Sequence, residues 1–236
     1  MSRPALPLTL LALVALTLVS PARLHAWQLT SAGLDSVPVP DGAAPLLPAP
    51  SADLKGDGSA QTLTVRAGQA QILDAGQVVW QSPAGWTVLQ ALFADLDRDG
   101  RPEAVLLVWR PFQPWPVDRW LPSGGRIQDF HDAAGQSCHL ILIGWRPAGG
   151  YGELWAGSAL AEPLRAIAAA DLDDDGLQEL VTLEGRYSDP RTAPGRDLKV
   201  WQWNGFGFTV VSSVPGSFAR MALLRRADSR VLILTP

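Results

Sequence analysis

The sequence predicts an all-β protein, a small β-propeller with four blades, and this prediction rests on three observations. The chain has 236 residues, 47% of them apolar and 18% charged, so it can bury a core and is not a disordered chain. Glycine (22 residues) and proline (20 residues) are frequent, as expected where turns join many short elements. An acidic loop motif also recurs three times, each time among similar short strand patterns.

The repeated motif has the form Asp-x-Asp-x-Asp-Gly-x-x-Glu. An incomplete copy spans residues 53–61, and two complete copies span residues 95–103 and 171–179. We name these segments loop 1, loop 2 and loop 3. Their starts are 42 and 76 residues apart, and self-similarity at such spacings indicates a repeat architecture.

Short strand patterns surround each loop. Ala-rich apolar runs precede loops 2 and 3 at residues 88–94 and 164–170. β-Branched or aromatic runs follow at residues 104–109, 139–145 and 153–156, at 180–183, 198–203 and 208–212, and, after loop 1, at 62–66, 71–74 and 78–81. Gly, Pro and Asp turns bound these runs, which favours strands over helices. Each repeat therefore supplies about four strands, the size of a propeller blade.

The two ends of the chain supply the rest of the predicted organisation. Residues 218–224 and 231–234 begin a fourth unit after the third repeat. Residues 27–52 are rich in proline and form either a spacer or the strand that closes the fourth blade. The predicted divisions are a signal peptide at 1–26, this Pro-rich segment at 27–52 and a propeller-like repeat domain at 53–236.

The N-terminus has the pattern of a secretory signal peptide. Arg3 precedes an apolar run over residues 5–19, Pro21 interrupts it, and Ala26 offers a small residue for cleavage. An uncleaved membrane anchor is the alternative, but a spanning helix needs about 20 apolar residues, more than this run provides. We therefore expect a secreted, periplasmic or cell-surface protein with no stable membrane span after cleavage.

Charge and cysteine content narrow the choice of partners. Without residues 1–26 the chain has 17 basic and 23 acidic side chains, a net charge of −6. That balance argues against nucleic acid or an anionic membrane as the partner. Cys138 is the only cysteine, so no internal disulfide can form. An exported domain without disulfides needs another source of stability, and a bound metal ion is the obvious candidate.

Loops 2 and 3 have the pattern of a calcium site. Ca²⁺ takes about six to eight oxygen ligands, and alternate residues of a tight loop direct three carboxylates to one point. Glycine at the sixth place allows the turn, while the seventh carbonyl and the ninth carboxylate complete the ligand set. The predicted ligands of two structural Ca²⁺ ions are Asp95, Asp97, Asp99, Arg101 and Glu103 in loop 2, and Asp171, Asp173, Asp175, Leu177 and Glu179 in loop 3.

Two other kinds of acidic loop are alternatives to this interpretation. An EF-hand requires a bidentate Glu at the twelfth place, where these loops have Leu106 and Thr182. A solvated acidic turn is the other alternative, but two nearly identical copies argue against it. Loop 1 differs, because Lys55 takes the third place and Gln61 the ninth. A lysine ammonium cannot ligate calcium, so we expect Lys55 to lie between Asp53 and Asp57 in place of an ion.

The loop pattern resembles the calcium-loop repeats of the FG-GAP/VCBS family over about residues 53–236. The turn at residues 204–208, Asn-Gly-Phe-Gly-Phe, is similar to a turn of such repeats, whereas the Gly-Ala-Pro signature of integrin-type repeats is absent after the loops. The resemblance implies a propeller in which each calcium loop joins the two innermost strands of a blade, with the Ala-rich strands near the axis. It also implies an exported binding or adhesion module, although some propellers are enzymes.

An aromatic insertion provides the candidate ligand surface. Residues 109–138 account for most of the extra length of the second repeat and include Trp109, Phe112, Trp115 and Trp120. Exposed aromatic loops on rigid scaffolds often bind ligands, so these four residues are the predicted ligand-binding set. The alternative is a loop folded over its own blade. For the tryptophans at strand ends we expect packing between blades, with sugar stacking as the alternative.

The sequence contains no G-x-S-x-G, H-E-x-x-H, P-loop or dinucleotide-binding motif. We therefore expect a non-enzymatic module that binds a protein or glycan ligand outside the cytoplasm. One alternative is a secreted glycan-active enzyme that uses the aromatic insertion as a substrate platform. The other is a structural component of an envelope assembly.

Overall fold

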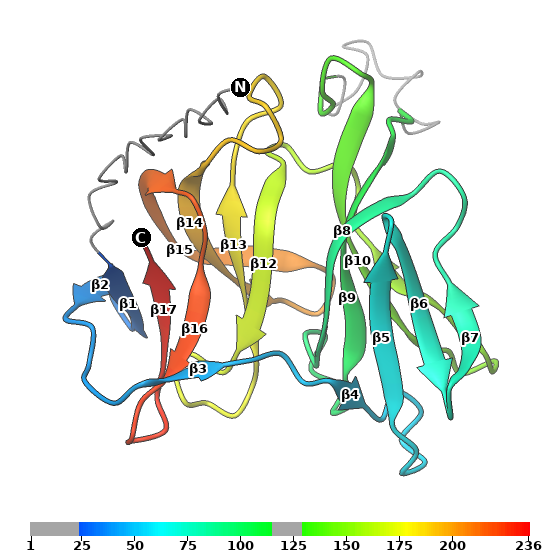
Figure 1. The fold of residues 1–236 in the computed structure, drawn as a ribbon, viewed down its shortest axis with the longest axis horizontal. Helices are drawn as coiled ribbons and strands as arrows, with labels where there is room; N and C mark the ends of the chain where they lie inside the picture. Colours follow the sequence, from blue (N-terminus) through cyan, green and yellow to red (C-terminus); the bar gives the residue numbers. More distant parts are fainter. Residues whose placement is uncertain (1–23, 115–128) are drawn as a thin grey trace, which may run out of the picture.

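The computed structural model describes residues 24–114 and 129–236 (Figure 1). In these residues every regular element is a β-strand, and the strands form four antiparallel sheets arranged as the blades of a propeller. The predicted fold class, an all-β propeller with four blades, is therefore confirmed. Across the same residues, no helix has the length and apolar character needed to cross a membrane.

Three blades follow the chain order from one edge of the sheet to the other. Blade 1 contains β4 (Ser51–Ala52), β5 (Gln61–Arg66), β6 (Gln69–Asp74) and β7 (Gln77–Gln81). Blade 2 contains β8 (Thr87–Ala94), β9 (Glu103–Pro111), β10 (Gln136–Trp145) and β11 (Tyr151–Ala156). Blade 3 contains β12 (Leu164–Ala170), β13 (Glu179–Glu184), β14 (Gly195–Trp203) and β15 (Phe208–Phe218). The first strand of each blade is the innermost one.

Blade 4 combines the two ends of the chain. Its strands lie in the order β2 (Gly33–Val37), β1 (His25–Thr30), β17 (Val231–Thr235), β16 (Ala222–Arg225) and β3 (Ala44–Leu46). In the antiparallel pair of β1 and β17, Trp27 lies opposite Ile233, and the Trp27 indole N–H donates to Thr235 Oγ1 at 2.9 Å. Of the two alternatives for residues 27–52, the structure has the one in which this segment closes the fourth blade.

Strand β1 begins before the predicted cleavage point. His25 pairs with Thr235 and Ala26 pairs with Leu234, and Ala26 is fully buried. Cleavage after Ala26 would therefore remove one buried residue of the closing strand. Residues 1–23, which include most of the predicted signal peptide, lie outside the described residues.

Strand β9 illustrates how a blade packs on both faces. Side chains alternate between the faces of a strand, and a continuous apolar run is typical of a strand buried on both sides. Three side chains of β9 pack toward blade 3 (Val105, Leu107, Trp109) and three toward blade 1 (Ala104, Leu106, Val108). A third cluster, which includes Leu183 and Leu223, joins blades 3 and 4. In the described part of the chain, no buried cluster joins blade 4 to blade 1.

The innermost strands of blades 2, 3 and 4 line a cavity of about 690 Å³, and Ala168, Ala169 and Ala170 of β12 form part of its wall. This placement agrees with the expectation that the Ala-rich strands lie near the axis. The inner edge of β12 is held by a side chain of β8. Gln90 Nε2 donates to the Ile167 carbonyl at 2.7 Å, and the Ile167 N–H donates to Gln90 Oε1 at 2.9 Å. Backbone groups on an edge strand thereby gain partners.

Loops 1, 2 and 3 each join the two innermost strands of a blade, as the resemblance implies. The aromatic insertion follows β9, whose nine residues span about 30 Å from the end of loop 2. The described flanks of the insertion therefore lie at the opposite end of blade 2 from the acidic loops.

Candidate functional site

The three loops share one backbone scaffold. In each loop the sixth residue, a glycine, donates its N–H to Oδ2 of the first aspartate. These contacts are Gly58 to Asp53 at 2.7 Å, Gly100 to Asp95 at 3.0 Å and Gly176 to Asp171 at 3.0 Å. The backbone N–H of the residue at the seventh place donates to the aspartate at the fifth place. These contacts are Ser59 to Asp57, Arg101 to Asp99 and Leu177 to Asp175. The aspartates therefore organise the turn as well as supply charge.

The fourth residue of each loop has a left-handed backbone. Its φ is 72° at Gly56, 66° at Arg98 and 63° at Asp174. Only glycine adopts this conformation without steric cost, so loops 2 and 3 hold a strained residue at this position. The same conformation in all three copies shows that the loops keep one geometry although loop 1 has a different residue set.

The ninth residue connects each loop to the core. Glu103 Oε2 accepts the Leu96 N–H at 3.0 Å, and Glu179 Oε2 accepts the Leu172 N–H at 3.0 Å. In loop 1, Gln61 Oε1 accepts the Leu54 N–H at 2.9 Å. The glutamine therefore keeps the hydrogen bond that the glutamates make but removes the negative charge.

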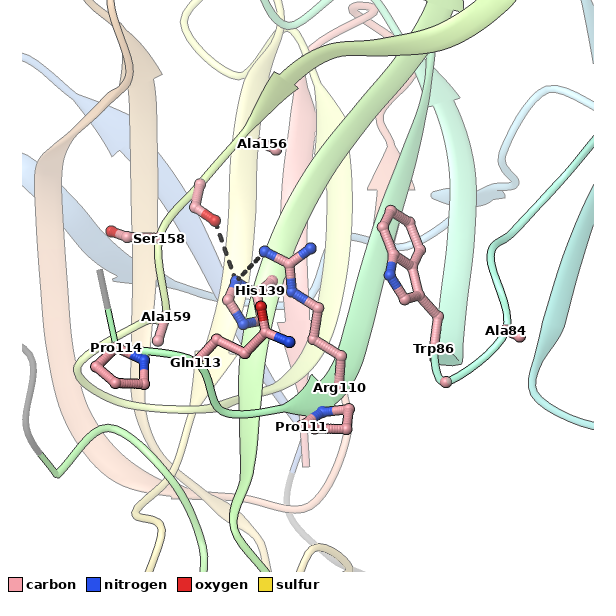
Figure 2. A pocket seen from close by; sticks show the side chains of 12 residues that line it. Ala84, Trp86, Arg110, Pro111, Gln113, Pro114, His139, Ala156, Ser158 and Ala159 are labelled. Atoms are coloured by element: carbon pink, nitrogen blue, oxygen red, sulfur yellow. Dashed lines mark hydrogen bonds between the residues drawn. The ribbon is translucent and has the colours of Figure 1, made fainter. Parts of the chain in front are cut away.

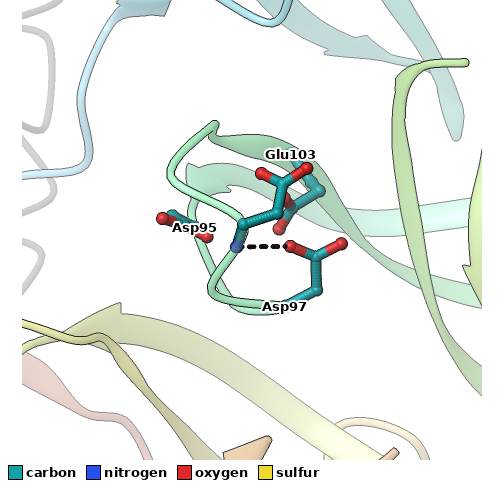
Figure 3. A group of neighbouring side chains, drawn as sticks. Asp95, Asp97 and Glu103 are labelled. Atoms are coloured by element: carbon teal, nitrogen blue, oxygen red, sulfur yellow. Dashed lines mark hydrogen bonds between the residues drawn. The ribbon is translucent and has the colours of Figure 1, made fainter. Parts of the chain in front are cut away.

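Loop 2 gathers four carboxylates (Figure 3). Asp95, Asp97, Asp99 and Glu103 each offer an oxygen atom, and these atoms all lie within 4.8 Å of one another. Glu103 is 1% exposed, and its burial, together with the three neighbouring aspartates, raises its pKa to about 9. Burial also raises the pKa of Asp97. Oδ1 of Asp95 is buried and has no hydrogen-bond partner among the described residues.

Loop 3 gathers three carboxylates rather than the four predicted. Oxygen atoms of Asp171, Asp173 and Glu179 lie within 4.8 Å of one another, whereas Asp175 is not in this group. Asp175 Oδ1 accepts the Leu177 N–H at 2.8 Å, as Asp99 accepts the Arg101 N–H in loop 2. Glu179 is fully buried, which raises its pKa to about 7, and Asp171 Oδ1 is buried without a partner in the described chain. Ligation by the Arg101 and Leu177 carbonyls stays a prediction.

Loop 1 replaces the acidic cluster with ion pairs. Lys55 Nζ lies 3.0 Å from Asp57 Oδ2 and 2.9 Å from Asp74 Oδ2 in strand β6. The expected pairing with Asp57 is present, but Asp74 rather than Asp53 is the second partner. Asp53 accepts the backbone N–H groups of residues 55–58, so its oxygens are already occupied. Hydrogen bonds from Ser59 and Lys55 lower the pKa of Asp57 to about 2.

Loops 2 and 3 contact each other across the junction of their blades. The Asp95 N–H donates to Gln178 Oε1 at 2.7 Å, and Arg98 Nη2 lies 3.2 Å from Glu179 Oε1. Sequence reasoning missed Arg98 and Gln178, because they occupy places in the motif that have no predicted ligand role. Their importance follows only from the position of one blade beside the next.

The aromatic candidates do not form one surface. Trp109 is 1% exposed and packs edge-to-face against Tyr187, with the Arg191 guanidinium 3.9 Å from the centre of its ring. Trp109 is therefore a core residue, and its predicted ligand-binding role is corrected. Phe112 is half-buried and packs against His131 at a ring distance of 5.0 Å. Trp115 and Trp120 lie outside the described residues.

Other strand-end tryptophans pack between blades, as expected. Trp155 of blade 2 makes edge-to-face contacts with Trp203 and Phe208 of blade 3 at ring distances of 5.7 and 5.3 Å. Such pairs add stability beyond the area that they bury.

No family model matches the chain, and no curated protein is detectably similar to it in sequence.

Proposed function

We propose that this chain is an exported, calcium-stabilised β-propeller that serves as a non-catalytic binding module, with one Ca²⁺ in loop 2 and one in loop 3. The fold supports a binding role, because a propeller presents loops from a rigid scaffold. Under this proposal the ions hold the inner ends of blades 2 and 3, while the partner, a protein or a glycan, binds elsewhere on the ring.

The observation on which the calcium sites rest is the pair of unpartnered oxygens, Asp95 Oδ1 and Asp171 Oδ1. A buried carboxylate oxygen without a partner is costly, and the cost grows when further carboxylates lie beside it. A divalent cation at the centre of each cluster offsets both costs. The clustered side chains offer oxygen atoms only, which suits a hard cation such as Ca²⁺ better than zinc or copper.

The surroundings of other buried polar groups support the non-catalytic role. Glu184 is paired with Lys199, and His139 contacts Ser137 Oγ and the Gly157 carbonyl. Cys138 is fully buried and accepts the Leu164 N–H. These groups are buried and have partners within the fold, which favours a structural role for them.

Export is supported by the N-terminal signal pattern, and a single cysteine leaves the exported domain without a disulfide to stabilise it. The placement of the loops between the innermost strands agrees with the FG-GAP/VCBS resemblance, in which exported binding modules are common. These features make Ca²⁺, present at high concentration outside cells, the fitting source of additional stability.

The proposal is tested by calcium titration calorimetry on the protein and on two single variants. Asp95→Asn and Asp171→Asn retain the acceptor for the glycine N–H of their loop but remove its charge. We expect two ions per chain in the wild type and one in each variant. Asp41→Asn, in an exposed turn of blade 4, is the matched control and should leave the stoichiometry at two. Binding of no ion by the wild type would refute the proposal.

A further inference from the structure

A pocket of about 470 Å³ with both polar and apolar lining residues lies at the end of blade 2 opposite the acidic loops (Figure 2). Its walls come from the β7–β8 connection, the end of β9, the start of β10 and the segment after β11. Trp86, Arg110, Gln113, His139 and Ser158 provide most of its chemistry. Its volume lies within the range of pockets that bind small organic ligands.

Arg110 extends between Trp86 and His139 (Figure 2). Its guanidinium carbon lies 5.6 Å from the centre of the Trp86 ring, and its Nη2 lies 3.4 Å from His139 Nδ1. That nitrogen of His139 is also 3.0 Å from the Gly157 carbonyl oxygen, to which it must donate its proton. Since His139 Nδ1 is then a donor, it cannot accept from Arg110, and no acceptor among the described residues uses the hydrogen-bonding capacity of the guanidinium.

Arg110 also lacks a counter-ion within the described residues, where no carboxylate lies within 4.0 Å of it. Its partial burial lowers the pKa of its guanidinium, which reflects the cost of removing a cation from water, and Glu153 of β11 only partly offsets this. An anion bound at Arg110 would offset the remaining cost. The planar guanidinium can donate two parallel hydrogen bonds to a carboxylate, whose single negative charge balances the single positive charge of one arginine.

From this geometry we infer that the pocket binds a sugar acid, with the carboxylate paired to Arg110 and the pyranose ring against Trp86. The Gln113 amide and the Ser158 hydroxyl are available for the sugar hydroxyls. This inference deepens the proposed binding role by naming a ligand class, and it involves none of the residues assigned to calcium.

A hydrolytic role for the same pocket does not fit its residues. Ser137 Oγ lies 2.8 Å from His139 Nε2, a distance suited to an activated nucleophile. However, Ser137 is fully buried and does not line the pocket. Its hydroxyl therefore cannot reach a bound sugar, and the pair instead holds the His139 ring in place.

The test is titration calorimetry with digalacturonate, with neutral galactobiose and with acetate, in the presence of Ca²⁺. We expect digalacturonate to bind at least about tenfold more tightly than either of the others, since a charge-assisted pair and a ring contact must act together. Equal affinity for galactobiose would overturn the inference, and so would equal affinity for a short poly-glutamate peptide.

Variants locate the binding. Arg110→Gln and Trp86→Ala should each weaken digalacturonate binding about tenfold or more, and Arg110→Lys should weaken it less than Arg110→Gln. Arg66→Gln, on the exposed end of β5, is the matched control and should bind as the wild type does. Binding by the Arg110→Gln variant equal to that of the wild type would overturn the inference. Because a folded variant retains two Ca²⁺ ions, failure here is distinguishable from failure of the calcium proposal.

Discussion

Nη2 of Arg98 in loop 2 lies 3.2 Å from Oε1 of Glu179 in loop 3. The Glu179 side chain is fully buried, while that of Arg98 is 19% exposed, so this ion pair is largely removed from water. Arg98 is also the residue of loop 2 that has a left-handed backbone. One acidic loop therefore supplies a positive charge to the acidic cluster of the other.

The first prediction concerns this ion pair. Arg98→Gln leaves Glu179 buried without its counter-charge, so in EDTA the variant should be less stable than the wild type by about 1–3 kcal/mol. With Ca²⁺ the loss of stability should shrink. The bound ion neutralises the carboxylates of loop 3, so Glu179 then depends less on the charge of Arg98. Urea unfolding of both proteins with and without Ca²⁺ measures the two differences.

Arg101→Gln is the matched control for that experiment, since it removes the same charge from the same loop without touching Glu179. Its stability in EDTA should stay within about 0.5 kcal/mol of the wild type. Equal stability of the wild type and the Arg98→Gln variant in EDTA would show that the ion pair does not contribute to the free energy of unfolding.

The second prediction is that calcium raises the melting temperature. At a free Ca²⁺ concentration 100 times the dissociation constant, each site adds about 2.7 kcal/mol to the free energy of unfolding. For a domain of this size that corresponds to about 5–10 °C per site. Scanning calorimetry with CaCl₂ and with EDTA gives the shift, and a melting temperature that is the same in both would contradict the two-site proposal.

The third prediction uses the shared scaffold of the loops to create a third site. Lys55→Asp combined with Gln61→Glu gives loop 1 the acidic residues of the motif, on a backbone that already makes the same hydrogen bonds. The calcium stoichiometry should rise from two to three. The single change Lys55→Met should leave it at two and lower the melting temperature, since Asp57 and Asp74 then face each other without the lysine. A doubly substituted protein that still binds two ions would show that loop 1 lacks the geometry for a third.

The fourth prediction concerns pH. Burial lowers the pKa of His139 to about 4, below its ordinary value near 6.5. The unfolded chain therefore binds a proton more readily than the folded one between those pH values, and stability falls as pH decreases through this window. The His139 contribution to this loss should reach about 2 kcal/mol at pH 5.

Urea unfolding between pH 7 and pH 4 in EDTA measures this dependence, and His139→Asn provides the comparison. The variant should be less stable at pH 7 but should lose less stability as the pH falls. Parallel pH profiles of the variant and the wild type would assign the acid sensitivity to other groups.

The fifth prediction concerns Cys138. Burial raises the pKa of its thiol to about 12, and the side chain is fully buried, so neither the thiolate nor a path for a reagent is available in the folded protein. A disulfide reagent should leave the native protein unmodified and should label one thiol per chain in urea. Rapid labelling in buffer would show that the junction of blades 2 and 3 opens readily.

The parts of this structure that could be predicted from the sequence are those whose interactions are local. Strands follow from short apolar and β-branched runs between turns, and each acidic loop is organised by hydrogen bonds within nine residues. When the donor and the acceptor of each hydrogen bond lie in the same motif, the structure of that motif can be predicted without knowledge of the rest of the chain. For this reason the blades and the carboxylate clusters of Asp95 and Asp171 were expected at their observed positions.

Contacts between distant residues were decided only by the tertiary structure. Strand β1 closes blade 4 by pairing with β17, which lies about 200 residues later in the chain. Because that partner is so distant, no local sequence pattern distinguishes a closing strand from a spacer. Lys55 finds Asp74 because Asp53 is already occupied by backbone N–H groups. Trp109 is buried because β9 packs against the neighbouring blade. Arg98 contacts Glu179 because loop 3 of blade 3 lies beside loop 2 of blade 2. The sequence pattern of a strand specifies which side chains lie on the same face of the sheet. The arrangement of the blades determines which residues those side chains contact.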